Sequence, residues 1–181
     1  PDAYLAQGEY QAAAAAYALS GDFGAAADLY AERLGKYQEA ALLYERAGQT
    51  SQAAELWIRQ GDLYRARDLY YQADDKMGLA GVLEQTGESL RAARLLEELG
   101  ELERAAPLYA EAGDPARAAE LYGLLRRFDR AREIWESLGS WEKVVKTLLI
   151  EGQTIQAAEV LEAHEQLERA AGQYEKAGQL A

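Results

Sequence analysis

The sequence predicts an all-α fold, a right-handed α-solenoid of about thirteen short antiparallel helices. Three observations support this prediction. Glycines recur about every thirteen residues, alanine and aromatic side chains recur at fixed positions after each glycine, and these positions share one helical face. A unit of this size cannot bury its apolar face alone, so the core must run along the stack.

The segment 35–48, GKYQEAALLYERAG, is a representative unit. With its first glycine as position 1, Tyr37, Ala40, Ala41 and Tyr44 occupy positions 3, 6, 7 and 10, which is the i, i+3, i+4, i+7 spacing of one helix face. Glycine suits the left-handed residue that ends a helix. Turns this short make consecutive helices antiparallel, so the structural repeat is a hairpin of about 26 residues. The units begin at Gly8, Gly21, Gly35, Gly48, Gly61, Asp74, Gly87, Gly100, Gly113, Arg126, Gly139, Gly152 and Glu165, and Gly178 opens a fourteenth.

Taken in order, residues 2–7 are expected to end a preceding helix, and the four units after them are regular. The fifth and sixth units, 61–86, depart most from the pattern, and two internal glycines weaken the sixth helix by about 1 kcal/mol each. Pro107 falls inside the helix of the eighth unit and is expected to kink or shorten it. No linker interrupts the repeats, which predicts one domain over 1–181, and we expect the chain to be a piece of a longer protein.

The unit resembles the second helix of the tetratricopeptide repeat, whose pattern is a glycine turn, an aromatic residue and A-x-x-x-Y/F-x-x-A. Tyr37, Ala40, Tyr44 and Ala47 match that pattern after the glycine turn. The first-helix signature W-x-x-L-G-x-x-Y is absent, and the period is 26 rather than 34 residues. The resemblance is to a shortened relative of this superfamily, similar also to short helical hairpins in coat and transport scaffolds. It implies protein or peptide binding, but the family's peptide-clamp residues have no counterpart here.

The charge balance limits the possible partners. The net charge is −12, with 31 acidic and 19 basic residues, which disfavours nucleic acid because phosphate binding needs concentrated lysine and arginine. It also disfavours anionic membrane surfaces. The sequence has no cysteine and no apolar run long enough to span a bilayer. We therefore expect a cytoplasmic protein that binds neither nucleic acid nor membrane.

We find no residues arranged for catalysis, for a metal or for a cofactor, so the sequence predicts a protein that is not an enzyme. The single histidine, His164, lies at a unit end without a nucleophile at a readable spacing, which favours a solvated or capping role. Asp74 and Asp75 could suggest a metal site, but a helix N-cap explains them better. Trp57, Trp135 and Trp141 are expected to pack in the core.

Position 5 carries a column of basic residues, which has two interpretations. It could be a charged ladder for an acidic partner, or each arginine could pair within its own helix. The second interpretation pairs Arg65 with Asp62 and Asp68, and Arg117 with Asp114 and Glu120. The column contains Arg65, Arg91, Arg104, Arg117, Arg130, Lys143 and Arg169.

The irregular units supply the candidate partner-contact residues. Arg67 and Arg132 occupy position 7, where other units have alanine or valine, so each guanidinium must reach solvent, pair with an acid or contact a partner. Neighbouring aromatic and basic residues complete the set, which is Tyr64, Arg67, Tyr71, Arg126, Arg127 and Arg132. A purely structural role, with the arginines extending past a register irregularity, stays open.

These patterns predict a non-catalytic protein–protein interaction or scaffold module that binds a protein or peptide, which another domain of the same full-length chain could supply. One alternative is a sensor or regulatory arm of a multidomain signalling ATPase. Another is a self-assembling structural spacer, since a cut solenoid exposes apolar ends that could stack. An α/α-toroid enzyme would need a central catalytic pocket, for which the sequence offers no residues.

Overall fold

The computed structural model describes residues 1–178, so the last three residues of the expected 1–181 domain lie outside the described residues. Within 1–178 the chain forms fourteen α-helices and no strand, which confirms an all-α helical-repeat solenoid. The helices fall into two larger compact units, each containing several of the 13-residue repeat units. They are called the N-terminal unit, residues 1–88, and the C-terminal unit, which begins at Ser89. The expectation of one domain stays a prediction.

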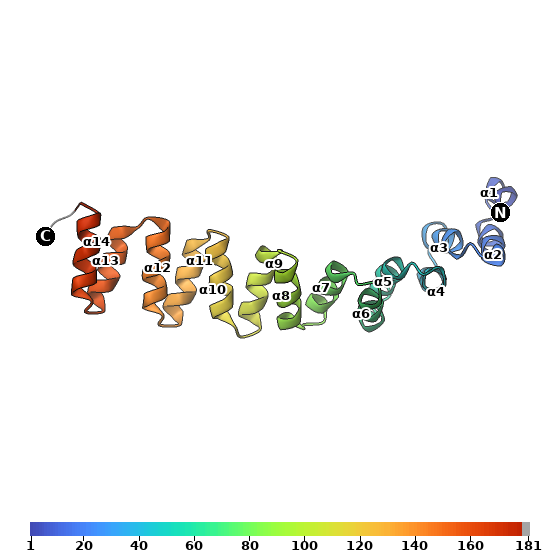
Figure 1. The fold of residues 1–181 in the computed structure, drawn as a ribbon. Coiled ribbons are helices and arrows are strands. Elements are labelled where there is room, and N and C mark those ends of the chain that lie inside the picture. Colours follow the sequence, from blue (N-terminus) through green and yellow to red (C-terminus); the bar gives the residue numbers. More distant parts are fainter. Residues whose placement is uncertain (179–181) are drawn as a thin grey trace. The chain divides into compact units, whose positions relative to one another are not determined.

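In each unit, every helix packs on the next one in the sequence (Figure 1). The N-terminal unit contains α1 (Asp2–Ala6), α2 (Tyr10–Ser20), α3 (Phe23–Glu32), α4 (Tyr37–Ala47), α5 (Thr50–Arg59), α6 (Leu63–Gln72) and α7 (Lys76–Gln85). The C-terminal unit contains α8 (Ser89–Glu98), α9 (Leu102–Glu111), α10 (Pro115–Leu124), α11 (Phe128–Ser137), α12 (Trp141–Glu151), α13 (Thr154–Ala163) and α14 (Leu167–Lys176). The short α1 lies where the sequence predicts the end of a helix, and the other thirteen follow the predicted units.

The turns are built as the glycine period predicts. After α4, Gly48 has φ 73°, and the next N–H, of Gln49, donates back to the carbonyl of Tyr44 at 2.9 Å. This bond satisfies a carbonyl that the helix end would otherwise leave free. Three unit starts lack glycine, and Asp74, Arg126 and Glu165 adopt the same left-handed conformation there, with φ of 52°, 57° and 59°.

The core uses positions 6, 7 and 10 of the repeat, with position 9 in several units, such as Leu56, Leu69 and Leu121, whereas position 3 is half-buried or exposed. Alanines at positions 6 and 7 are fully buried in most units, so neighbouring helix axes can approach closely. The side chain at position 10 fills the remaining space. At most 6% of the residue is exposed at this position in Trp57, Tyr70, Tyr109 and Trp135. Trp57 and Trp135 are therefore core residues as expected, whereas Trp141 is only half-buried.

Pro107 does not shorten its helix. It lies within α9, which has ten residues like most of its neighbours. Proline removes the hydrogen bond to the carbonyl four residues earlier, here that of Glu103. Both Pro107 and Glu103 are exposed, so water can reach the freed carbonyl, which explains why the helix continues.

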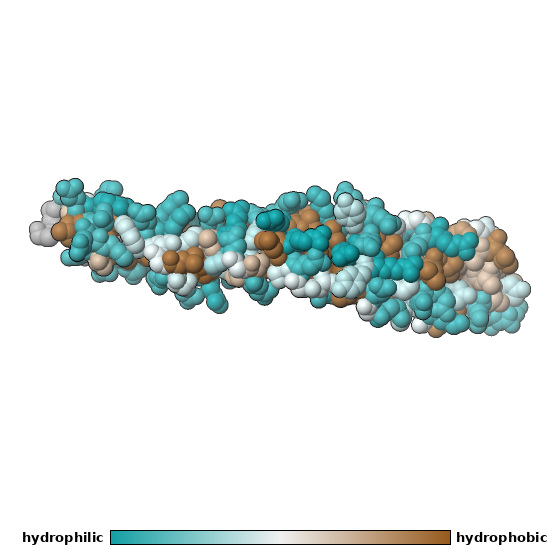
Figure 2. Space-filling view, turned by 90° about the horizontal axis from the view of Figure 1, so that it is seen from below, coloured by the Kyte–Doolittle hydropathy of each residue, from teal (hydrophilic) through white to brown (hydrophobic). Residues whose placement is uncertain are grey.

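The surface is dominated by polar side chains. In Figure 2, teal covers most of the visible face of each unit, and the brown areas are small and separated. None of the helices in residues 1–178 is long and apolar enough to cross a membrane.

Candidate functional site

Three of the predicted contact residues form a stripe on α6. Tyr64, Arg67 and Tyr71 are spaced by three and four residues, which places them on one face of the helix. The two tyrosines are 69% and 77% exposed. The Arg67 guanidinium lies 5.5 Å from the Tyr64 ring centroid and pairs with Asp68 at 3.1 Å and with Glu88 at 3.6 Å. Of the outcomes expected for an arginine at position 7, Arg67 thus takes the intramolecular ion pair.

Arg132 on α11 is held by the side chains of three residues in the C-terminal unit. Its guanidinium donates to Glu151 at 2.7 Å and to Gln153 at 3.1 Å, and it also pairs with Asp129. Only 18% of its side chain is exposed. These contacts fasten α11 to the end of α12 and to the turn before α13, which is a structural role.

Arg126 and Arg127 lie in the turn between α10 and α11, and both are exposed. Arg126 takes the left-handed turn position and lies over the ring of Phe128, 5.9 Å from its centroid. Arg127 is the N-cap residue of α11. This turn forms one edge of a groove that the sequence did not identify.

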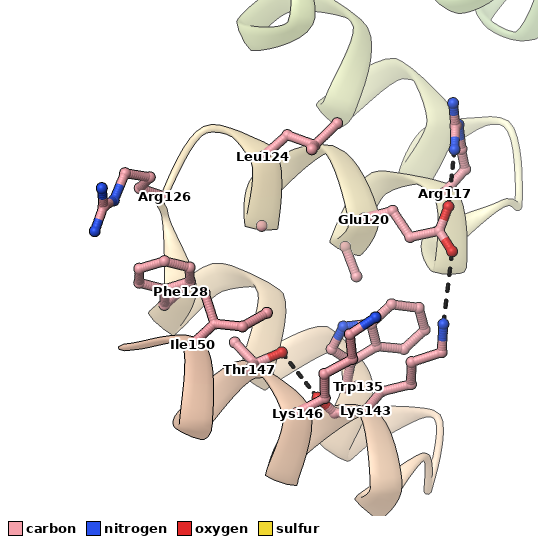
Figure 3. Close-up of a pocket in the computed structure, with 12 residues that line it drawn as sticks. Arg117, Glu120, Leu124, Arg126, Phe128, Trp135, Lys143, Lys146, Thr147 and Ile150 are labelled. Atoms are coloured by element: carbon pink, nitrogen blue, oxygen red, sulfur yellow. Dashed lines mark hydrogen bonds and ion pairs between the residues drawn. The ribbon is translucent and has the colours of Figure 1, made fainter. Parts of the chain in front are cut away.

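The groove lies between α10 and α12 and has a volume of about 640 Å³. Both helices line it with the same repeat positions, 5, 8 and 12, which point away from the core. On α10 these residues are Arg117, Glu120 and Leu124, and on α12 they are Lys143, Lys146 and Ile150 (Figure 3).

One end of the groove is polar. Arg117 pairs with Glu120 at 2.8 Å, and the other side of Glu120 faces the Lys143 ammonium at 3.7 Å (Figure 3). Lys143 also lies 5.2 Å from the ring centroid of Trp135, which is 6% exposed. Arg117 also pairs with Glu97, so the two cations at this end are balanced by two carboxylates.

The other end is apolar. Leu124 and Ile150 occupy matching positions on the two helices and are 69% and 59% exposed, with Phe128 beside Ile150 (Figure 3). Lys146 projects from α12 between the two ends, and no acidic residue among 1–178 pairs with it. Exposed aliphatic side chains next to an unpaired cation make this groove a suitable binding surface.

Arg117 also belongs to a cluster beside the groove. Glu97 on α8 accepts a hydrogen bond from the Tyr109 hydroxyl of α9 at 2.6 Å and pairs with the Arg117 guanidinium of α10. Hydrogen bonds from Arg117 and then from Tyr109 lower the pKa of Glu97 below its ordinary value. Burial, followed by the hydrogen bond with Glu97, raises the pKa of Tyr109 to about 12. The cluster links three successive helices.

The same cluster occurs in the N-terminal unit. Glu45 accepts from the Trp57 indole N–H at 2.7 Å and pairs with Arg65 at 2.9 Å, and the Arg65 guanidinium lies over the Trp57 ring. These three residues precede Glu97, Tyr109 and Arg117 by 52 positions, or two hairpins. The arrangement is therefore a property of the repeat.

The clusters correct one sequence-based interpretation. Arg65 pairs with Glu45, two helices earlier, instead of with Asp62, whose carboxylate caps α6 by accepting from the Arg65 backbone N–H at 3.0 Å. Arg117 does pair with Glu120 in its own helix, as expected, but Asp114 likewise caps the backbone. Arg65, Arg117 and Lys143 at position 5 therefore join alternate helices, whereas Arg130 pairs with Glu133 in its own helix at 3.9 Å.

The remaining candidates have structural roles. Asp75 accepts from the backbone N–H of Gly78 at 2.9 Å, which confirms the predicted N-cap. His164 is exposed at the end of α13, where it stacks on Trp141 with ring centroids 4.7 Å apart. Within residues 1–178, no group of three histidine, cysteine or carboxylate side chains could hold a metal ion.

A signal for the groove was present in the sequence, in the charge at positions 5, 8 and 12 of alternate helices. In α8, α10, α12 and α14 these positions hold seven basic and two acidic residues, and in α9, α11 and α13 they hold two basic and three acidic residues. The bias becomes visible only when alternate helices are compared.

Comparison with known proteins adds no assignment, because neither a protein-family model nor a curated protein matches this sequence.

Proposed function

We propose that this chain is a non-catalytic protein–protein interaction module of the tetratricopeptide-like kind, and that it binds a segment of another protein in the groove between α10 and α12. The observation that carries the proposal is the pair Leu124 and Ile150, which stay 69% and 59% exposed on facing helices and are not needed for the core. Two helices that present matching apolar side chains across a groove suit an inserted peptide or helix.

The rest of the described chain supports this proposal over catalysis. The polar residues around the groove are arginine, lysine and one glutamate, and Glu120 is engaged with Arg117 and Lys143. Neither a nucleophile paired with a base nor a set of metal ligands lies among the residues that line it.

Site-specific photo-crosslinking tests the proposal. A benzoylphenylalanine placed at position 150 in the full-length protein, in cells of its source, should crosslink to a discrete partner. The matched control is position 19, because Leu19 is 90% exposed and occupies the same repeat position 12 on α2. Equal crosslinking at the two positions, or none at 150, would contradict the proposal. A crosslink only to a second copy of the chain would favour the self-assembling spacer instead.

A further inference from the structure

The groove is positively charged in a strongly acidic protein. Residues 117–146 contain seven basic and five acidic side chains, whereas the rest of the chain contains twelve basic and 26 acidic ones. Four cations line the groove, Arg117, Arg126, Lys143 and Lys146. Glu97 and Glu120 balance Arg117 and Lys143, which leaves the charges of Lys146 and Arg126 unbalanced. A local positive surface of this kind attracts and orients a partner of opposite charge.

Two of these cations remain available to a ligand. Lys146 has no acidic partner in residues 1–178, and within the same residues the Arg126 guanidinium forms no ion pair and lies over the ring of Phe128. Arg117 is held by Glu97 and Glu120, so it is less free to turn toward a ligand. The ligand's negative charge is therefore best met at Lys146, with Arg126 at the outer edge of the groove beyond Phe128 (Figure 3).

Apolar side chains lie within the same groove as these cations. Leu124 of α10 and Ile150 of α12 both line it, and Lys146 is placed on α12 one helical turn before Ile150. A ligand that fills the groove must therefore carry an apolar group and a carboxylate about one helical turn apart. An amphipathic protein segment has this spacing.

We propose that the groove between α10 and α12 binds an acidic amphipathic segment of a partner protein. Its carboxylates face Lys146 and Arg126, and its apolar side chains pack between Leu124 and Ile150. This inference rests on the proposed function and specifies the chemistry of the partner. Single-stranded nucleic acid suits the groove less well, because Trp135 is 94% buried and Arg126 already lies over the Phe128 ring, so neither ring offers a free face for base stacking.

The test is a selection from a displayed library of random peptides of about twelve residues, long enough to span a helix the length of α12 when helical. The target is the intact chain, and selected peptides are synthesised with amidated C-termini, so that only side-chain carboxylates can supply negative charge. We expect the selected peptides to combine aspartate or glutamate with large apolar residues. Their affinity is measured by fluorescence anisotropy.

Two pairs of variants localise the binding. Lys146→Glu should weaken binding by about tenfold, since it replaces an attraction with a repulsion. Its control is Arg33→Glu, an equal change of charge on an exposed residue of the N-terminal unit. Leu124→Ser should also weaken binding, whereas Leu19→Ser, at the same repeat position, should not. A peptide with lysine in place of its acids should bind Lys146→Glu better than the unmodified chain.

The outcomes separate the inference from the proposed function. If Leu124→Ser weakens binding but Lys146→Glu does not, or if the selected peptides lack acidic residues, the acidic-ligand inference is wrong and the peptide groove stands. If neither variant changes the affinity, or if selection yields no binder, both fail. Displacement of a bound peptide by an oligothymidylate of similar length would also overturn the inference in favour of nucleic acid.

Discussion

Replacing Glu97 by glutamine tests whether the acid–aromatic–arginine cluster stabilises the repeat. Glutamine keeps the shape of the side chain, but it loses the charge and keeps only one of the two acceptor oxygens, so it cannot accept all the hydrogen bonds from Tyr109 and Arg117. A hydrogen bond to a charged group contributes about 1 kcal/mol more than a neutral one. Three such bonds end at Glu97, one from Tyr109 and two from Arg117, and the 40% exposure of Arg117 reduces their contribution by solvent screening. We expect a loss of about 1–2 kcal/mol at neutral pH.

The pH dependence distinguishes this mechanism from a simple packing defect. The folded-state pKa of Glu97 is lowered from 4.5. The stabilisation is therefore fully present above pH 4.5 and is lost as the pH falls through the folded-state value. The difference between the unmodified chain and Glu97→Gln should be largest near neutral pH and should shrink progressively in acid.

The assay is thermal unfolding followed by circular dichroism at a series of pH values, with hydrogen exchange of α8–α10 as the local readout. In a chain of this size the melting temperature should fall by roughly 2–8 °C at neutral pH. The control is Glu133→Gln, because Glu133 is 68% exposed and 3.9 Å from Arg130, a pair expected to contribute little. An equal loss at neutral and acidic pH, or no loss at neutral pH, would refute the reasoning.

Four further substitutions have expected outcomes in urea or thermal unfolding. Gly78→Ala should lower the free energy of unfolding by about 1–3 kcal/mol, because the new Cβ would lie 2.3 Å from a ring atom of Tyr70. Its control is Gly81→Ala in the same helix, where the new Cβ meets open space. This change should raise the free energy of unfolding by up to about 1 kcal/mol. Asp74→Gly should stabilise by about 1 kcal/mol, since φ is 52° there; no gain would contradict this. Arg132→Ala should cost about 2–3 kcal/mol, and a near-neutral effect would show that its ion pairs are dispensable.

The sequence alone was sufficient to predict the units, the turns and the core, because each depends on residues close together in the chain. The glycine period marks each turn, and the spacing of Tyr37, Ala40 and Tyr44 defines a helix face without knowledge of any neighbour. The reason for the internal Gly78 could not be predicted from its own helix. Seen alone it only weakens a helix, but in the fold the ring of Tyr70 packs where its side chain would be.

Contacts between alternate helices could not be predicted from the unit. The nearest acids in the sequence to Arg65 are Asp62 and Asp68, and helix spacing alone favours them. The structure pairs Arg65 with Glu45, twenty residues away, because alternate helices bring position 11 of one unit beside position 5 of the unit after next. That neighbourhood depends on how hairpins stack, which a single helix pattern does not determine.

The repeat separates the residues that maintain the fold from the residues available for binding. Positions 3, 6, 7 and 10 face neighbouring helices, so their size and polarity are tightly constrained. Positions 8 and 12 face outward, and their residues can change without loss of the core. Position 12 is Leu19 in α2, Leu124 in α10 and Lys176 in α14, on the same helical framework. A groove with distinct chemistry can therefore arise at one pair of helices while the rest of the solenoid stays acidic, which is the arrangement that α10 and α12 display.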